Sequence, residues 1–325
     1  NALIEREDAG LDLQTVTLAQ LNTMYKQAQS ECKAETKAVQ LLEKVGGHPK
    51  AMAELELRIE NANEHMERAK SRLVALQSGD SESVRVWQRI YDITMSACLH
   101  TCARLHANVT DEHSAGESTY RDELGSVVQD LIDRKIAEED DGALVVKCDG
   151  IKEPTIIRKR DGGYLYATTD MAAIKRRVGT LGGDIVVYCV DSRQSLHFKQ
   201  VFAAAHKAGY DKASDGHDAS LVHAMFGTIL GEDGKPLKSR SGENLNLSDL
   251  LDEAVSRAEA TLSERSPDIT GDERHQIAEA VAMAAVKYTD LAIERVKDYI
   301  FSFDRMLAFE GDTGPPSGGD RATVL

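Results

Sequence analysis

Between residues 184 and 254 the chain alternates short apolar runs with amphipathic stretches, and this alternation constrains the fold more than any other feature. The run DIVVYCVD holds six consecutive apolar residues, 185–190. A short run of this kind, bounded by polar residues, predicts a parallel strand buried on both faces. HFKQVFAAAHKAGY follows as a predicted helix closed by Gly209, then LVHAMFGTIL as a second strand and a helix from about Ser248. Strands that alternate with helices indicate an α/β fold in which helices cover a parallel sheet.

A helical region precedes this segment. Residues 15 to about 110 are predicted to be helical, and one apolar stripe with spacings of three and four should face a partner helix. Its members are Leu55, Ile59, Ala62, Met66, Ala69, Leu73 and Leu76. Gly79 ends this helix and a second one follows. A helical hairpin with a packed seam is a sufficient explanation of the region.

Local turn and cap signals mark the remaining elements. GALVVKCD and PTIIRKRDGGYLYATTD are strand-like, with a hairpin turn expected at Asp161-Gly162-Gly163. Thr270 and Glu273 have the spacing of a capping box at the start of a C-terminal helix. The final GDTGPPSGGDRATVL is rich in Gly and Pro and predicts an unstructured end.

Charge and cysteine content limit the class of protein. The 325 residues carry a formal net charge of −15, which opposes broad electrostatic attraction to nucleic acid, so an anionic ligand must meet local cations. No apolar run approaches the roughly 18 to 20 residues that span a bilayer, and the first residues do not read as a secretory signal. Five scattered cysteines favour a reducing compartment, so we expect a cytoplasmic location and no membrane.

Candidate binding residues follow the two predicted parallel strands. Ligands bind beyond the carboxyl ends of such strands. The first end delivers Gln194 and His197, and the second delivers GEDGKPLKSRSG with the cations Lys235, Lys238 and Arg240. Glycines and lysines of this kind suit a phosphate group. The segment is not a P-loop, because Ile229 and Pro236 occupy two of its defining positions. A solvated surface hairpin explains the composition of this loop equally well.

A second candidate site lies where the hairpin passes into a helix. Tyr166 and Asp170, four residues apart, offer a ring with a hydroxyl and a carboxylate, which suits a cationic ligand. A core aromatic residue and a helix cap explain the same pair more simply.

Two further groups of residues carry less information. Cys98, His100 and Cys102 resemble metal ligands, but only the cysteines share a helical face, and we predict no metal site. The residues alone assign no function to a polar series near the C-terminus, namely Tyr288, Asp290, Tyr299, Asp304 and Glu310.

Taken together and in order, several segments resemble the arginyl-tRNA synthetases, a family of class I aminoacyl-tRNA synthetases. The resemblance covers roughly residues 70–313 and rests on RLVALQSGD, GES, RKRDGGYLYATTDMAA, VDSRQSLHFKQVF, MFGTILGEDGKPLKSRSG, LSDLLDEA and AVKYTDLAIERVKDYIFSFDRMLAFEGDT. It implies the second half of a Rossmann-like nucleotide-binding domain. It also implies a reaction in which ATP activates L-arginine as arginyl-adenylate, before the arginyl group passes to tRNA(Arg).

The resemblance also implies a role for each candidate residue. Tyr166, Asp170 and Gln194 would hold the substrate arginine. His197 would flank the ribose and phosphates of ATP, and the adenine would lie against Met225, Phe226 and Gly227. ATP is expected as a substrate with Mg²⁺ as its counter-ion.

KPLKSRSG is similar to the family's lysine-methionine-serine-lysine-serine loop, which folds over the pyrophosphate. Charge builds on this leaving group during adenylation, and cations that bind the transition state more strongly than the ground state lower the barrier. Lys235 and Lys238 are therefore the expected catalytic residues, with Arg240 supporting them and Lys238 also contacting ATP.

The sequence departs from the family pattern at both ends. It has no histidine-x-glycine-histidine motif, and it lacks the first half of the nucleotide fold and the helical anticodon-binding domain. We therefore expect a chain truncated at both ends that does not form arginyl-adenylate alone, and a companion segment that carries the missing half. A non-catalytic paralogue or regulatory module is the alternative.

The resemblance also predicts three regions. A helical connective insertion is expected over residues 1–115, the Rossmann-like half with the lysine loop over 116–247, and a helical region over 248–325. The unstructured end is expected from about residue 312.

Overall fold

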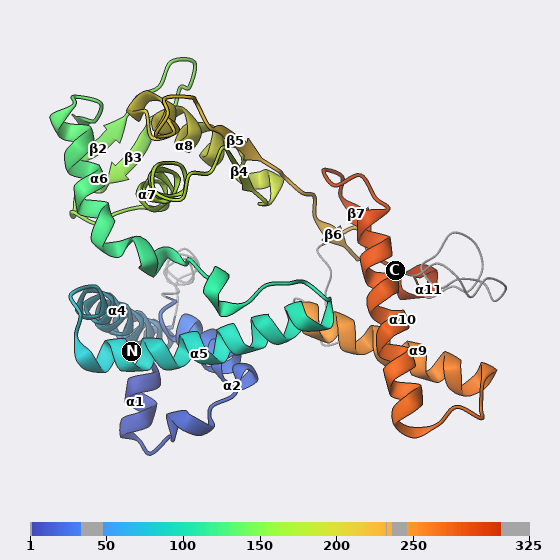
Figure 1. Cartoon of the computed structure of the whole chain (residues 1–325). Coiled ribbons are helices and arrows are strands. Elements are labelled where there is room, and N and C mark those ends of the chain that lie inside the picture. Colours follow the sequence, from blue (N-terminus) through green and yellow to red (C-terminus); the bar gives the residue numbers. More distant parts are fainter. Residues whose placement is uncertain (1, 34–47, 232, 236–245, 307–325) are drawn as a thin grey trace. The chain divides into compact units, whose positions relative to one another are not determined.

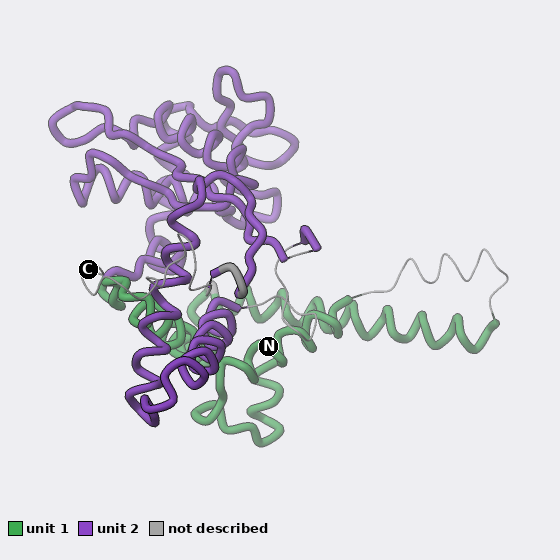
Figure 2. The backbone as a smooth tube through the Cα atoms, turned by 90° about the vertical axis from the view of Figure 1, so that its right-hand side faces the viewer, with its two compact units in different colours: residues 1–112 green, residues 113–325 purple. Residues whose placement is uncertain are grey.

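The computed structural model describes residues 2–33, 48–231, 233–235 and 246–306 (Figure 1). The chain forms two compact units, residues 1–112 and 113–325 (Figure 2). No helix in the described ranges is long and apolar enough to cross a membrane. The five cysteines, all in the described part, are free thiols.

The described part of the first unit is built from helices. These are α1 (Ala2–Asp8), α2 (Leu18–Glu31), α4 (Pro49–Gln77) and α5 (Ser81–Arg104), with short 3-10 turns at Leu13–Thr15 and Asp111–His113. A capping box between Thr17 and Gln20 starts α2. Gly79, with φ +83°, follows the end of α4, as predicted.

The predicted apolar seam of α4 is only partly correct. Ala62 is buried, whereas Met66 is 39% exposed and Leu73 is 54% exposed. The described neighbours α2 and α5 therefore do not cover the whole stripe that the periodicity marks.

The second unit begins with a helix and a small antiparallel sheet. A 3-10 turn (Glu117–Tyr120) leads into α6 (Arg121–Asp133), and the strands β1 (Glu138–Asp140), β2 (Ala143–Val146) and β3 (Thr155–Arg158) pair in that order. The predicted turn after β3 is confirmed. Gly162 has φ +85°, and the Lys159 amide donates to the Gly163 carbonyl at 2.8 Å.

Two parallel strand pairs follow, interleaved with helices. α7 (Tyr166–Gly179) leads to β4 (Ile185–Tyr188), which pairs in parallel with β5 (Ser220–His223) after a 3-10 turn (Ser192–Gln194) and α8 (Ser195–Ala208). β6 (Ile229–Leu230) then pairs in parallel with β7 (Tyr299–Ile300). The predicted second strand is therefore present as two pieces, and the helix that Gly209 closes, with φ +63°, is confirmed.

The prediction that β4 is buried on both faces is wrong. Val186 and Tyr188 are buried, whereas Ile185 is 66% exposed and Val187 is 52% exposed. Successive side chains of a strand point to opposite faces, and within the described part of the chain only one face of β4 is covered.

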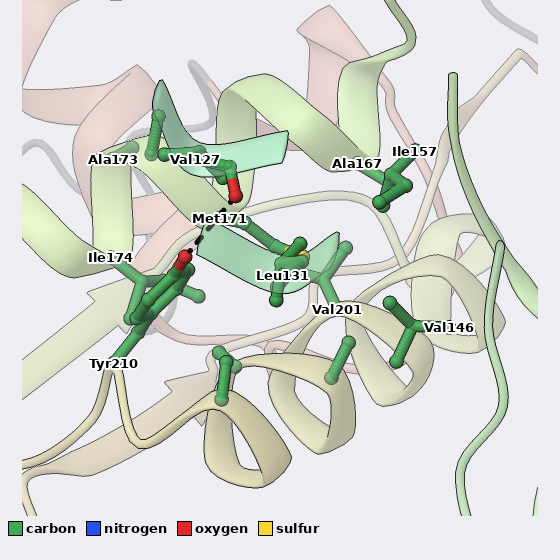
Figure 3. Close-up of a cluster of buried hydrophobic side chains, with 14 of the residues drawn as sticks. Val127, Leu131, Val146, Ile157, Ala167, Met171, Ala173, Ile174, Val201 and Tyr210 are labelled. Atoms are coloured by element: carbon green, nitrogen blue, oxygen red, sulfur yellow. Dashed lines mark hydrogen bonds between the residues drawn. The ribbon is translucent and has the colours of Figure 1, made fainter. Parts of the chain in front are cut away.

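The core of this α/β part packs α6, α7 and α8 around β2 and β3 (Figure 3). Leu131, Ile157, Met171 and Val201 are completely or almost completely buried. The Tyr210 hydroxyl donates to the Asp130 carboxylate at 2.7 Å and lies 3.4 Å from the Val127 carbonyl (Figure 3). Burial first, and then the bond to Asp130, raise the pKa of Tyr210.

Helices complete the unit. α9 (Leu247–Arg265) begins close to the expected Ser248 and packs against α10 (Gly271–Leu291), and α11 (Phe303–Met306) is the last described element. Thr270 is the N-cap of α10, but its side chain makes no capping hydrogen bond, so the predicted capping box is wrong. Gly271, directly after it, has φ +58°, and the first turn therefore lacks the regular geometry that a capping box needs.

Candidate functional site

Tyr166 and Asp170 lie where the β-hairpin leads into a helix, which is the position that the sequence predicts. Tyr166 is the first residue of α7, and Asp170 lies four residues later on the same helix face. The buried Thr168 hydroxyl donates to the Ile157 carbonyl of β3, which fixes the start of the helix on the sheet. The Tyr166 ring is 69% exposed and the Asp170 side chain is half-buried.

The carboxyl end of β4 brings a second group of predicted residues to the same place. Gln194 is the N-cap residue of α8, and His197 lies in the first turn of that helix. His197 Nε2 is 2.7 Å from Asp170 Oδ2. The structure thus joins an expected arginine ligand to an expected ATP ligand, whereas no hydrogen bond among the described residues joins Gln194 or Tyr166 to Asp170.

Asp191, at the same strand end, was not singled out by the sequence. Its carboxylate accepts hydrogen bonds from the Arg193 amide at 2.8 Å and from the Arg193 guanidinium at 2.8 and 2.9 Å. These bonds lower the pKa of Asp191 to about 2. Asp191 therefore remains an anion with its oxygens engaged.

The segment between β5 and β6 contains Met225, Phe226 and Gly227. It forms hydrogen bonds with a different part of the chain on each side. On one side the Ser192 amide donates to the Phe226 carbonyl at 3.0 Å. On the other side the Gly227 amide donates to the Arg295 carbonyl at 2.9 Å, and the Arg295 guanidinium donates to the Met225 carbonyl.

Gly227 is required by a close backbone approach. A Cβ atom at this position would lie 2.4 Å from the carbonyl carbon and oxygen of Lys297. A residue with a side chain would therefore push apart the two segments that form this part of the site.

A cavity of about 570 Å³ opens beside this segment. Phe226 and Gly227 form part of its wall, and three carboxylates line it, those of Asp191, Asp290 and Glu294. The Tyr299 hydroxyl is 3.2 Å from Asp290 Oδ1, and burial raises the pKa of Tyr299. Asp290 and Tyr299 belong to the polar series to which the sequence assigned no function. The fold brings the two side chains together near the end of α10.

Only the beginning of the lysine loop is described. The Gly231 amide donates to the Lys235 carbonyl at 2.7 Å, and the Lys235 amide donates to Asp233 Oδ1 at 3.1 Å, so a tight turn presents an exposed Lys235 side chain. Lys238 and Arg240 lie outside the described residues. Their expected roles, and the position of Lys238 relative to Asp170, therefore stay predictions.

An open groove of about 590 Å³ runs along β4 and includes Asp170. Arg177 and Tyr188 also line this groove, and the Arg177 guanidinium lies 5.2 Å from the centre of the Tyr188 ring. Burial raises the pKa of Tyr188 to about 12. Asp170 therefore lines a partly apolar groove along β4, a strand that pairs only with β5 among the described strands.

Comparison with known proteins links this arrangement to one family. The model of the family described as class I tRNA synthetases (R), catalytic domain, matches residues 5–303. The arginine–tRNA ligase of Serratia proteamaculans is 48% identical over 255 residues, which are 77% of this chain and 44% of that protein. The arginine–tRNA ligase of Shewanella amazonensis is 46% identical over 265 residues, 80% of this chain and 45% of that protein. The chain thus spans less than half the length of these relatives.

Solved structures agree with these matches. The arginyl-tRNA synthetase of Plasmodium falciparum superimposes with a TM-score of 0.65 at 27% identity, over 79% of this chain and 42% of that one. The arginyl-tRNA synthetase of Thermus thermophilus has a TM-score of 0.58 at 19% identity, over 87% of this chain and 54% of that one, and shows the shared fold.

Proposed function

The chain belongs to the class I arginyl-tRNA synthetase family, and from this premise we propose that it contributes a half-site for arginine and ATP to an arginine–tRNA ligase. In the proposed reaction ATP activates L-arginine as arginyl-adenylate, and the arginyl group then passes to tRNA(Arg). The observation that supports the proposal is the direct contact between Asp170 and His197 near the carboxyl end of a parallel strand, because these two residues are the proposed ligands of arginine and ATP.

Arginine recognition would centre on Asp170. A guanidinium group is planar and only donates hydrogen bonds, so it matches the two oxygens of a carboxylate and stacks on aromatic rings. The exposed Tyr166 ring, one helical turn before Asp170, offers such a surface, and Gln194 is the third proposed contact.

The adenine of ATP would lie against Met225, Phe226 and Gly227. The Phe226 ring is 41% exposed and lines the cavity, which supports an apolar contact with the adenine. His197 would lie beside the ribose and phosphates.

Mg²⁺ would enter with the phosphates of ATP as their counter-ion. Among the described residues, no group of three His, Cys, Asp or Glu side chains is arranged to hold a metal ion. We therefore assign the ion no protein ligand.

The lysine loop would act on the leaving group. Pyrophosphate gains negative charge as the arginine carboxylate displaces it, so cations from Lys235 and Lys238, supported by Arg240, would stabilise the transition state more than the ground state. Lys235 is exposed on a tight turn directly after β6, which supports this role.

A companion segment would complete the site. β4 is paired only with β5 among the described strands, and Ile185 and Val187 form an exposed apolar face beside the groove that contains Asp170. An uncovered strand edge and apolar face suit a partner that adds a strand and a covering layer. The free cysteines fit a reducing compartment, and we infer that the assembly works in the cytoplasm.

Titration of the chain with arginine and with citrulline tests the arginine site, because citrulline keeps the shape of arginine but carries no charge. We expect tighter binding of arginine, and Asp170→Asn should remove most of the difference, about tenfold for a lost charge-assisted hydrogen bond. Asp161→Asn, in the exposed turn before α7, is the matched control. Equal binding of both ligands by the unaltered chain would reject the proposed role of Asp170.

A further inference from the structure

The contact between Asp170 and His197 joins two helices that are separated in sequence. Asp170 comes from α7 and His197 from the first turn of α8, and the two side chains are 27% and 29% exposed. Partial shielding from water strengthens a hydrogen bond of this kind. Because a carboxylate only accepts hydrogen bonds, this contact requires the tautomer in which His197 Nε2–H donates a hydrogen bond to Oδ2 of Asp170.

The orientation of the His197 ring is fixed by buried aromatic packing. Its edge lies against the Phe198 ring, with centroids 5.1 Å apart and planes at 78°. Phe198 is 4% exposed and packs against Tyr188 at 5.0 Å and His223 at 4.8 Å between ring centroids. The imidazole is therefore presented to Asp170 by a rigid part of the core.

We propose that His197 is a positioning residue for guanidinium recognition, because it holds Oδ2 of Asp170 and leaves Oδ1 to receive the substrate. The proposal deepens the proposed function and rests on it. No hydrogen bond to Oδ1 is present among the described residues. A carboxylate of an aspartate otherwise rotates over a broad range about its last torsion angle, and fixing it beforehand reduces the entropy lost when arginine binds.

A histidine suits this position better than a lysine or an arginine. Lysine or arginine at position 197 would orient the carboxylate but would also neutralise the charge that distinguishes arginine from citrulline. The imidazole N–H fixes the geometry of the carboxylate without the permanent positive charge of those two side chains.

The first test uses the chain without substrate. In ¹⁵N-labelled protein, nuclear magnetic resonance should detect the His197 Nε2–H proton, and Asp170→Ala should shift or abolish this signal. His275 is the internal control, because its Nδ1 lies 2.6 Å from Glu259 Oε1, away from α7 and α8, and its signals should stay in place. Identical His197 signals in both proteins would overturn the proposal, whether or not arginine binds.

The second test compares two substitutions of one residue. His197→Gln keeps an N–H donor of similar reach, and His197→Leu keeps bulk without a donor. Titration with arginine and citrulline should show the ratio of the two affinities falling roughly tenfold in the leucine variant and staying within about threefold in the glutamine variant. A general loss of stability lowers both affinities together and leaves this ratio unchanged.

An unchanged ratio in His197→Leu would overturn the positioning role while the proposed function stands. Failure of the unaltered chain to bind arginine would contradict the proposed function, and the experiment without substrate then decides whether His197 holds Asp170. The outcomes of the two proposals are therefore distinguishable.

Discussion

Asp170 and Asp191 are two carboxylates beside the same strand with opposite surroundings. Arg193 engages both oxygens of Asp191 and keeps its pKa near 2, whereas Asp170 receives a single hydrogen bond from His197 among the described residues. Of these two carboxylates, Asp170 has an oxygen that accepts no hydrogen bond from the described residues. This difference supports the proposal that Asp170, and not Asp191, binds arginine.

A histidine outside the site should make stability depend on pH. His206 Nδ1 is 2.6 Å from Oδ2 of the buried Asp211, and this hydrogen bond, followed by the charge of Asp211, raises the pKa of His206. A pKa raised in the folded state contributes stability that is fully present below the unfolded-state value of about 6.5 and is lost as pH rises through the folded-state value.

The matching experiment compares His206→Gln with the unaltered chain in urea denaturation at several pH values. The loss in free energy of unfolding caused by His206→Gln should be larger at pH 5.5 than at pH 8.5. His100→Gln, at an exposed position of α5, is the control and should show no such trend. A difference for His206→Gln that is constant or grows with pH would contradict the assignment.

At the scale of elements, the close packing of the segment between β5 and β6 against Lys297 requires glycine at position 227. In Gly227→Ala the new methyl group would meet the Lys297 carbonyl at 2.4 Å, and the backbone must move apart. We expect a loss of about 1–3 kcal/mol in the free energy of unfolding and faster hydrogen exchange at the Tyr299 amide, which donates to the Thr228 carbonyl. Gly179→Ala, with no heavy atom within 4 Å of its Cβ, should be neutral, and equal behaviour of the two variants would contradict the close approach.

A charged substitution can test whether the exposed face of β4 is the interface with a companion segment. Val187→Lys should change the stability of the isolated chain by less than about 1 kcal/mol, because the side chain is already half exposed. It should nevertheless prevent assembly with the remaining parts of a relative such as the Serratia proteamaculans ligase, measured by size-exclusion chromatography. Leu57→Lys, on an exposed position of α4, is the control. Assembly that tolerates Val187→Lys would exclude this face as the interface.

These elements show what the sequence could and could not predict. Apolar runs and glycine signals predicted the parallel strands, the turn at Gly162 and the end of α8, because local periodicity and backbone preference determine them. The exposed face of β4 could not be predicted, since a run of six apolar residues has no polar side to mark it. Neither could the contact between Asp170 and His197, because their spacing of 27 residues has no helical or strand period and depends on how α7 and α8 pack.

At the scale of the whole molecule, the chain combines a helical unit with an α/β unit, and the proposed arginine site lies in the second of these. It spans 44–45% of the length of two arginine–tRNA ligases of its family. The histidine-x-glycine-histidine motif expected from the family resemblance is not in its sequence. Under the proposed function, other residues would face Asp170 across the site.

Arginine-dependent exchange between ATP and pyrophosphate, with tRNA present, tests this account most directly. We predict negligible exchange by the 325 residues alone and measurable exchange after the remaining parts of a relative are added. Asp170→Asn and Lys235→Ala should each reduce the restored rate by about tenfold or more. Exchange by the chain alone at the restored rate, or a restored rate that does not respond to Asp170→Asn, would contradict it.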